Sequence, residues 1–301
     1  MIFTDIRRGR PFAKDPAVIR FRERYIMYYS IPPWEDGRAG DGYAIGIAES
    51  DDLDRWKIIG EILPEGAIEA KGLCAPDAVV LEGKVNLFYQ TYGNGKNDAI
   101  CHAVSDDGIT FRRHPENPVF RPSGDWNAGR AIDADVVVAD DRLYLFWATR
   151  DPAMKIQMPG VSSAALNSGF GKTAWKQLNT DGPILRPELP WEGDCIEAPA
   201  VCRHDGRWFM WYGGSYNATP QQIGCAVSDD GIRWKRIGSE PWLRCGRPGE
   251  WNQHESGHPY VFVDTDGATH LFYQGTGDKG KTWWLTRIAV EWRDGLPLPG
   301  K

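Results

Sequence analysis

The stretch AIDADVVVADDRLYLFWATR, residues 131–150, shows the pattern that decides the fold: a strand opened by an ionisable residue, a turn, and an aromatic-rich strand. The pattern occurs five times along the chain. Its openings are DPAVI from Asp15, DAVVL from Asp77, DADVVV from Asp133, EAPAV from Glu197 and HPYVFV from His258. The openings are spaced by 62, 56, 64 and 61 residues. A nearly constant period of this size, built from short strands and turns, is typical of a β-propeller.

Three of the units continue into a second kind of turn. Its copies are ESDDLDRWKIIG from Glu49, SDDGITFRRH from Ser105 and SDDGIRWKRIG from Ser228. Aspartate side chains that accept turn amides, with glycine in two copies, are typical of a hairpin between a third and a fourth strand. We therefore expect an all-β fold: a five-bladed β-propeller with four antiparallel strands per blade, which occupies residues 1–301 as one domain.

The composition argues against several classes of function. The net charge is −6 and the charges are interspersed, whereas a nucleic-acid surface needs clustered Lys and Arg. No stretch has the apolar length that spans a bilayer, and no motif implies an organic cofactor. The opening MIFTDIRRGRPFAKD lacks the apolar region of a secretory signal. We expect a cytoplasmic protein without nucleic-acid or membrane partners, and the sequence leaves the oligomeric state open.

The first strand of each blade lines the central channel of a propeller. The five openings are then expected to place four carboxyl groups and one imidazole in a ring at one mouth. Like charges close together raise one another's pKa, which leaves a protonated acid beside an ionised base. Two such carboxyls are the working parts of glycoside hydrolysis: one protonates the leaving oxygen, and the other activates water or attacks the anomeric carbon.

The openings also resemble the blade-opening motifs of glycoside hydrolase family 43. The matching segments are Asp15-Pro16, Ala75-Pro76-Asp77, Ala131-Ile132-Asp133 and Ile196-Glu197-Ala198-Pro199. That family comprises inverting five-bladed propeller enzymes that act mainly on arabinose- and xylose-containing glycans. The resemblance implies that Asp15 is the general base, that Glu197 is the general acid and that Asp133 tunes the acid's pKa. His258 matches a histidine that faces a metal ion or water, so the resemblance allows Ca²⁺ or another ion in the channel.

One departure concerns the third blade. The family usually has proline after the aspartate, whereas Ala134 follows Asp133 here, and Asp135 is a second candidate. We expect these two aspartates to point differently, so that only one faces the channel, and the spacing to Asp77 and Glu197 favours Asp133. Related propeller families that cleave anhydrogalactose, galactofuranose or fructose linkages, such as families 117 and 32, remain open.

Further residues are candidates for binding sugar. Asp77 is expected either to bind a sugar hydroxyl or to support the ring. The candidates for stacking on sugar rings, with plain packing as the alternative, are Trp34, Trp147 and Trp211. Those expected to hydrogen-bond sugar hydroxyls at the ends of second strands are Gln90, Arg150 and Gln274. His254, four residues before His258, is expected either to reach the mouth or to cap a turn.

Two long connections, residues 30–42 and 149–164, are predicted to close one end of a groove into a pocket. We therefore expect an inverting exo-glycosidase that releases terminal sugars from plant or algal oligosaccharides, with arabinofuranosidase-, xylosidase- or galactosidase-like specificity. One alternative is a retaining, fructosidase-like hydrolase, whose motif the triplet Arg150-Asp151-Pro152 superficially matches. The other is a non-catalytic carbohydrate-binding propeller, against which the presence of both Asp15 and Glu197 argues.

Overall fold

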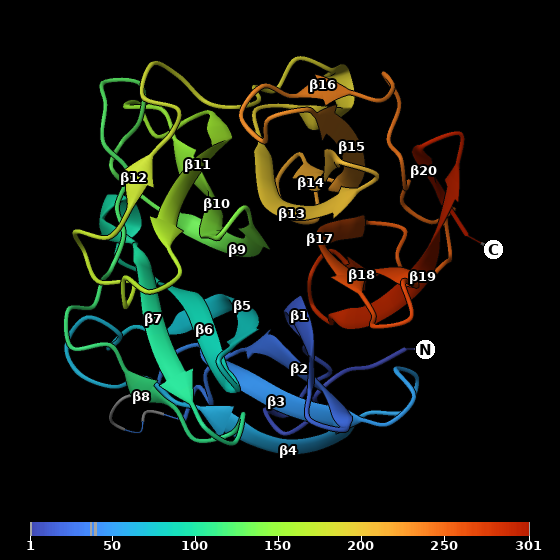
Figure 1. The fold of residues 1–301 in the computed structure, drawn as a ribbon. Helices are drawn as coiled ribbons and strands as arrows, with labels where there is room; N and C mark the ends of the chain where they lie inside the picture. Colours follow the sequence, from blue (N-terminus) through green and yellow to red (C-terminus); the bar gives the residue numbers. More distant parts are fainter. Residues whose placement is uncertain (1, 37, 39–40, 301) are drawn as a thin grey trace.

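The computed structural model describes residues 2–36, 38 and 41–300, and it confirms the predicted five-bladed propeller. Five four-stranded antiparallel sheets surround a central channel (Figure 1). The first blade contains β1 (Lys14–Phe21), β2 (Arg24–Ile31), β3 (Ala44–Ser50) and β4 (Lys57–Ile62), and the second contains β5 (Leu73–Leu81), β6 (Lys84–Thr91), β7 (Ile100–Ser105) and β8 (Arg112–Arg113). The third contains β9 (Ile132–Ala139), β10 (Arg142–Arg150), β11 (Gln157–Ala165) and β12 (Lys176–Gln177), and the fourth β13 (Ile196–His204), β14 (Arg207–Gly214), β15 (Gln222–Ser228) and β16 (Lys235–Arg236). The fifth contains β17 (Glu255–Val263), β18 (Thr269–Thr276), β19 (Trp284–Arg293) and β20 (Leu296–Pro299).

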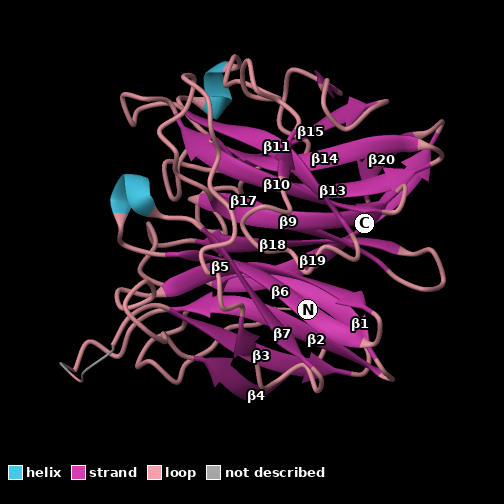
Figure 2. Cartoon of the chain, turned by 60° about the vertical axis from the view of Figure 1, so that its left-hand side comes forward, coloured by secondary structure: helices cyan, strands magenta, loops and turns pink. Residues whose placement is uncertain are grey.

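Almost all regular structure is strand (Figure 2). In the described residues the helices are two short 3₁₀ turns, η1 (Gly95–Asn97) and η2 (Pro190–Glu192), and no helix there is long and apolar enough to cross a membrane. The four strands of each sheet follow one another in chain order. The first strands, β1, β5, β9, β13 and β17, lie innermost and contact one another around the channel (Figure 1).

The turn predicted between third and fourth strands is present. Ser105 Oγ accepts the N–H of Gly108 at 2.8 Å, and Ser228 Oγ accepts that of Gly231 at 2.9 Å. Both glycines have the positive φ that such a turn requires, 79° and 74°. In the first blade Leu53 takes this place with a φ of 61°, which is a strained conformation for a leucine.

Each innermost strand contains a β-bulge close to its start, where its pairing with the second strand shifts register. The residues with left-handed backbone at these bulges are Asp15 (φ 52°), Ala75 (46°), Asp133 (51°), Ala198 (48°) and His258 (43°). This conformation costs a non-glycine residue roughly 1–2 kcal/mol. Bulges re-aim side chains, and here they direct three ionisable groups to one mouth of the channel.

Side chains from the preceding blade cap the N–H groups of four bulged residues. Gln274 Oε1 accepts from Asp15 (2.9 Å), Ser30 Oγ from Ala75 (2.8 Å), Gln90 Oε1 from Asp133 (2.7 Å) and Gln221 Oε1 from His258 (2.8 Å). A buried N–H group needs a partner. Because each cap crosses a blade boundary, the hydrogen bonds that satisfy the bulges also hold neighbouring blades together.

A second set of links lies two residues further along three of the same strands. Asp77 accepts the N–H of Val136, Asp135 accepts the N–H of Val201 at 3.1 Å, and Tyr260 donates to the carbonyl of Val18 at 3.0 Å. Each bond joins a side chain of one blade to the backbone of the next. Behind the mouth, polar contacts therefore also link neighbouring blades.

The segment before β1 joins the fifth blade to the first. Phe3 and Leu285 exchange two backbone hydrogen bonds of 2.8 Å each, and Ala13 donates to the carbonyl of Trp283 at 3.2 Å. The ring of Phe3 also packs against that of Tyr29, with 5.1 Å between centroids. The first residues of the chain thus close the ring against strands made at its end.

In three blades an aromatic ring of the second strand lies over a glycine of the third. A Cβ added at Gly46 would lie 2.4 Å from the Tyr29 ring, at Gly160 2.3 Å from Trp147, and at Gly224 2.3 Å from Tyr212.

The prediction of a long loop over residues 149–164 is wrong in its second half, because β11 begins at Gln157. Gly160 of this strand makes room for the Trp147 indole.

We expect Gly160→Ala to lower the free energy of unfolding by about 1–3 kcal/mol, because the added methyl overlaps a fully buried ring. Urea denaturation monitored by tryptophan fluorescence would measure the change. Gly238→Ala is the matched control: its Cβ would meet no atom within 4 Å, so no loss is expected. Equal stability of the two variants would contradict the packing argument.

Candidate active site

A cavity of about 190 Å³ opens at the mouth where the innermost strands begin. Of the predicted site residues it brings together Asp15, Gln90, Asp133, Arg150, Glu197 and His258. It also contains polar and aromatic side chains that the sequence reasoning missed: Lys14, Tyr92, Arg130, Gln157, Tyr216 and Asn217. The five predicted openings do not form one ring at a fixed strand position. Relative to the bulges, Glu197 comes one residue earlier and Asp77 two residues later.

An imidazole lies between two carboxyl groups at the centre of the site. Nε2 of His258 is 3.3 Å from Oδ1 of Asp15 and 3.5 Å from Oδ1 of Asp133. Burial opposes protonation of the ring, but the two carboxylates outweigh it and raise the pKa of His258 to about 9. The ring is therefore cationic at neutral pH.

Asp15 is surrounded by cationic groups. Lys14 Nζ is 3.9 Å from Oδ1 of Asp15 and donates to Oδ1 of Asn217 at 2.8 Å. The same nitrogen lies over the ring of Trp283, 4.6 Å from its centroid. Burial of Asp15 favours its neutral form, yet the charges of His258 and Lys14 prevail and hold the pKa of this carboxyl below its usual range. Asp15 is thus an ionised carboxylate that can accept a proton.

Glu197 is held by three side-chain amides. Gln157 Nε2 donates to its Oε2, and Asn217 and Gln221 donate to its Oε1 at 3.0 and 2.6 Å. Burial, and next the charge of Asp133, raise the pKa of Glu197 above its ordinary value. Two carboxyls in one small cavity therefore differ in proton affinity, with Asp15 ionised and Glu197 disposed to hold a proton.

Two of these amides occupy equivalent places in neighbouring blades. Gln157 and Gln221 both lie where the third strand begins, and each forms a parallel bridge to the following blade. A Cβ at Gly213 would lie 2.8 Å from the Gln221 amide, so this glycine leaves room for the side chain to reach the channel. Glutamine at the start of a third strand is the signal that could have identified both, and for Gln221 the glycine beside it on the second strand adds to that signal.

Asp77 and Asp135 lie behind the cavity. Both are buried, at 2% and 4% exposure, and bond to the next blade as described above. Burial raises the pKa of Asp77 to about 7, and burial and the charge of Asp77 raise that of Asp135 well above its usual range. The expectation that Asp77 belongs to the ring at the mouth is wrong. Asp133 lines the cavity and Asp135 does not, which agrees with the choice between them.

Several residues predicted to bind sugar lie outside the cavity. Trp147 and Trp211 are completely buried in the packing between strands. Gln274 is also fully buried, because its amide caps the Asp15 bulge and donates to Glu255 at 2.6 Å. His254 faces the carbonyl of Gly277 at 2.8 Å through Nδ1. None of these four side chains lines the site.

Trp34, the remaining stacking candidate, is 38% exposed. Its ring lies between the guanidinium groups of Arg8 and Arg38, at 3.9 and 4.5 Å. It belongs to the predicted long connection of residues 30–42, of which residues 37, 39 and 40 lie outside the described part of the chain. Packing between arginines accounts for its position, and Trp34 does not line the cavity.

The ion that the resemblance allows beside His258 has few protein ligands there. Nε2 of His258 faces carboxyl oxygens of Asp15 and Asp133, at 3.3 and 3.5 Å. Within residues 2–36, 38 and 41–300 no group of three His, Cys, Asp or Glu side chains could hold a metal ion. Nδ1 of His258, buried without a partner, suits a water molecule.

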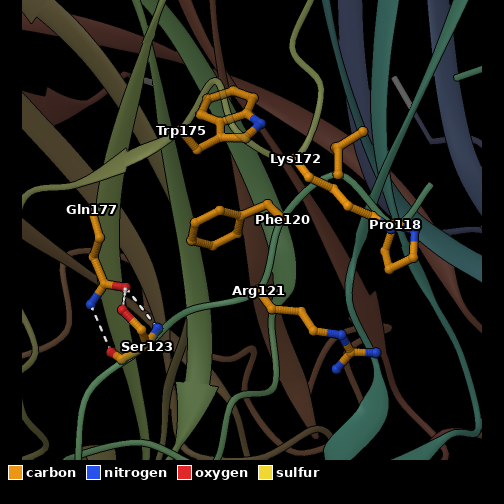
Figure 3. A pocket seen from close by; sticks show the side chains of 8 residues that line it. Pro118, Phe120, Arg121, Ser123, Lys172, Trp175 and Gln177 are labelled. Carbon is orange, nitrogen blue, oxygen red and sulfur yellow. Dashed lines mark hydrogen bonds between the residues drawn. The ribbon is translucent and has the colours of Figure 1, made fainter. Parts of the chain in front are cut away.

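A separate hollow of about 410 Å³ lies on the flank of the propeller, with Phe120 and Trp175 among its walls (Figure 3). Some of its polar groups already have partners: the N–H of Ser123 donates to Gln177 Oε1 at 2.9 Å, and Arg121 donates to the carbonyl of Asn97. It contains none of the carboxyl groups that distinguish the channel mouth.

The sequence profile described as Glycosyl hydrolases family 43 matches residues 9–297. Among solved structures, a thermostable family-43 glycoside hydrolase is 20% identical with a TM-score of 0.76, covering 99% of this chain and 96% of that one. An endo-1,4-β-xylanase from Bacteroides thetaiotaomicron is 21% identical (TM-score 0.72, coverage 96% and 94%). An α-L-arabinofuranosidase from Lactobacillus brevis is 19% identical (TM-score 0.70, coverage 96% and 94%). At identities of 19–21%, the similarity to these structures shows that the chain shares their fold.

The raised pKa of His258 predicts a pH-dependent contribution to stability. Its ordinary value is 6.5 and its folded value about 9, so the contribution is complete below pH 6.5 and is lost as the pH rises through 9. We expect the difference in unfolding free energy between wild type and His258→Gln to shrink by on the order of 2 kcal/mol between pH 6 and pH 9.5. An imidazole resonance that titrates at or below pH 6.5 in NMR spectra would contradict the ion-pair geometry.

Proposed function

Since this chain belongs to glycoside hydrolase family 43, we propose that it hydrolyses terminal glycosidic bonds of plant or algal oligosaccharides with inversion at the anomeric carbon. One observation carries the proposal: a single small cavity contains an ionised carboxylate, Asp15, and a carboxyl with raised pKa, Glu197. A base and an acid on opposite sides of the scissile bond are what single-displacement hydrolysis requires.

In the proposed reaction Asp15 removes a proton from a water molecule, whose oxygen attacks the anomeric carbon. Glu197 gives its proton to the glycosidic oxygen as the bond to that oxygen breaks, and both carboxyls regain their starting states by exchange with solvent. The charge of Asp133 raises the pKa of Glu197 and so favours its protonated form. The cationic His258 lies between Asp15 and Asp133 and stabilises their two negative charges.

The size of the cavity supports the release of single sugars. Its volume of about 190 Å³ is below the roughly 300–1,000 Å³ of pockets for drug-sized ligands, and it suits one monosaccharide unit. Structural neighbours described as a xylanase and an arabinofuranosidase make arabinose- and xylose-containing oligosaccharides the first candidates, with galactose-containing ones next. Release of mid-chain fragments from a polysaccharide would contradict the exo mode of action.

The decisive experiment is proton NMR of the purified protein with arabino-, xylo-, galacto- and anhydrogalacto-oligosaccharides, followed from the first minutes. We expect a released sugar whose initial anomeric configuration is inverted relative to the substrate, since water attacks directly. Retention would make Asp15 a nucleophile and favour a fructosidase-like reaction. Line broadening without release would favour a carbohydrate-binding protein.

Glu197→Gln should reduce kcat/KM by about 10²–10⁴-fold on natural oligosaccharides, whose leaving oxygen needs a proton. The loss should be much smaller on aryl glycosides with activated leaving groups, which depart without protonation. Asp15→Asn is the matched comparison and should be severe on both substrates, because each needs an activated water. Equal losses for Glu197→Gln on the two substrates would remove this residue from the acid role.

A further inference from the structure

Two guanidinium groups converge on one neutral oxygen beside Glu197. Arg150 ends β10, and its Nε donates to Gln157 Oε1 at 2.9 Å. Arg130 precedes β9, and its Nη1 donates to the same oxygen at 3.1 Å. Both arginines line the catalytic cavity, and the Gln157 amide that they share bonds to Glu197.

In the described part of the chain, neither positive charge forms an ion pair with a carboxyl group that lines the cavity. Among the described residues Arg150 has no ion-pair partner: its other contacts are the carbonyl of Met154 at 3.5 Å and the ring of Tyr216 at 5.2 Å. Arg130 forms an ion pair with Asp98, 3.7 Å from Nε, although this nitrogen makes no hydrogen bond. Like charges at such short range repel one another in a partly buried site. An anion between them would relieve that repulsion.

The requirements of Gln157 do not explain two arginines. Gln221 occupies the equivalent place in the fourth blade and holds the other oxygen of Glu197. Its own Oε1 is satisfied by the backbone N–H of His258 at 2.8 Å, without any cation. The Gln221 amide is thus oriented by a single neutral donor, and no cation is needed for that purpose.

The carboxyl groups of the site do not account for the arginines either. Asp15 and Asp133 share the imidazolium of His258, and Asp15 also has Lys14. Glu197 accepts hydrogen bonds from amides only. The arginine pair therefore lies at the Glu197 end of the cavity, where the leaving group departs, without an ion pair to any carboxyl group that lines it.

We propose that Arg150 and Arg130 bind a carboxylate of the substrate next to the scissile bond, so that the oligosaccharide this enzyme trims contains a uronic acid. The planar guanidinium fork matches a carboxylate in two parallel hydrogen bonds. The ring of Tyr216 beneath Arg150 keeps this fork facing the cavity. The inference rests on the proposed glycosidase function and specifies its substrate class.

Binding separates this inference from the proposed reaction. Glucuronate and galacturonate, each compared with its neutral methyl ester, would be titrated into the wild-type protein by ligand-observed NMR. We expect the uronates to bind at least about tenfold more tightly, with the preference falling as salt increases. In Arg150→Gln the preference should disappear, and in Arg150→Lys, which keeps the charge but loses the fork, it should be intermediate.

Arg121→Gln, at the flank hollow of Figure 3, is the matched control and should leave the preference unchanged. Thermal melts of all variants would show that they fold. Equal binding of uronates and neutral sugars, or a preference that survives in Arg150→Gln, would overturn the inference. In turnover, acidic oligosaccharides should be cleaved faster than the same material after carboxyl reduction. Inverting cleavage of both materials at equal rates would support the glycosidase function and refute the preference for an acidic substrate. Selective binding of uronates without cleavage would support the carboxylate site and refute the glycosidase function.

Discussion

The hydrogen bond between a bulged N–H and a side chain of the preceding blade is the contact on which the site depends. A left-handed residue is strained, and a buried N–H without a partner costs about 1–3 kcal/mol. At Asp15 and Asp133 that partner is a glutamine, Gln274 or Gln90, from the neighbouring blade. The bulge is stable only where two blades meet correctly, and the same bulge turns the carboxyl group into the cavity. The same contacts therefore hold neighbouring blades together and position the carboxyl groups of the active site.

The distribution of charge around the cavity is asymmetric. On the Asp15 side a lysine and an imidazolium favour the ionised form, so the proton acceptor is available at neutral pH. On the Glu197 side the groups that bond directly to the carboxyl are neutral amides, with Arg150 and Arg130 one residue further out, and burial with the charge of Asp133 favours the protonated form. An acid and a base share one small cavity because cations lie directly beside Asp15, whereas only neutral amides bond to Glu197.

The fold could be predicted because a repeat leaves a period in the sequence, and each repeat must bury its apolar face against the next. The expected convergence of Asp15, Asp133 and Glu197 agrees with the cavity. The expectation that Asp77 stands in the same ring is wrong, because Ala75 takes the bulged place of the second blade and Asp77 lies two residues beyond it. The proline after the bulged residue, as in Asp15-Pro16 and Ala75-Pro76, marks this alignment in the sequence. Gln157 was missed because its function depends on a partner forty residues away in another blade. Contacts across blade boundaries are the information that a periodic pattern does not contain.

The closure of the ring has a consequence for how the protein is made. Phe3 pairs with Leu285, so this part of the chain finds its partner only after the residues of the fifth blade have been synthesised. Until then the first blade has one unpaired flank, including Phe3, Tyr29 and the apolar residues around them that later pack against the fifth blade. A contact between residues this far apart in the sequence forms slowly, and the apolar surface that it covers stays exposed to solvent until then. Chaperones that bind nascent chains would therefore have their greatest effect on this protein at the contact between its first and fifth blades.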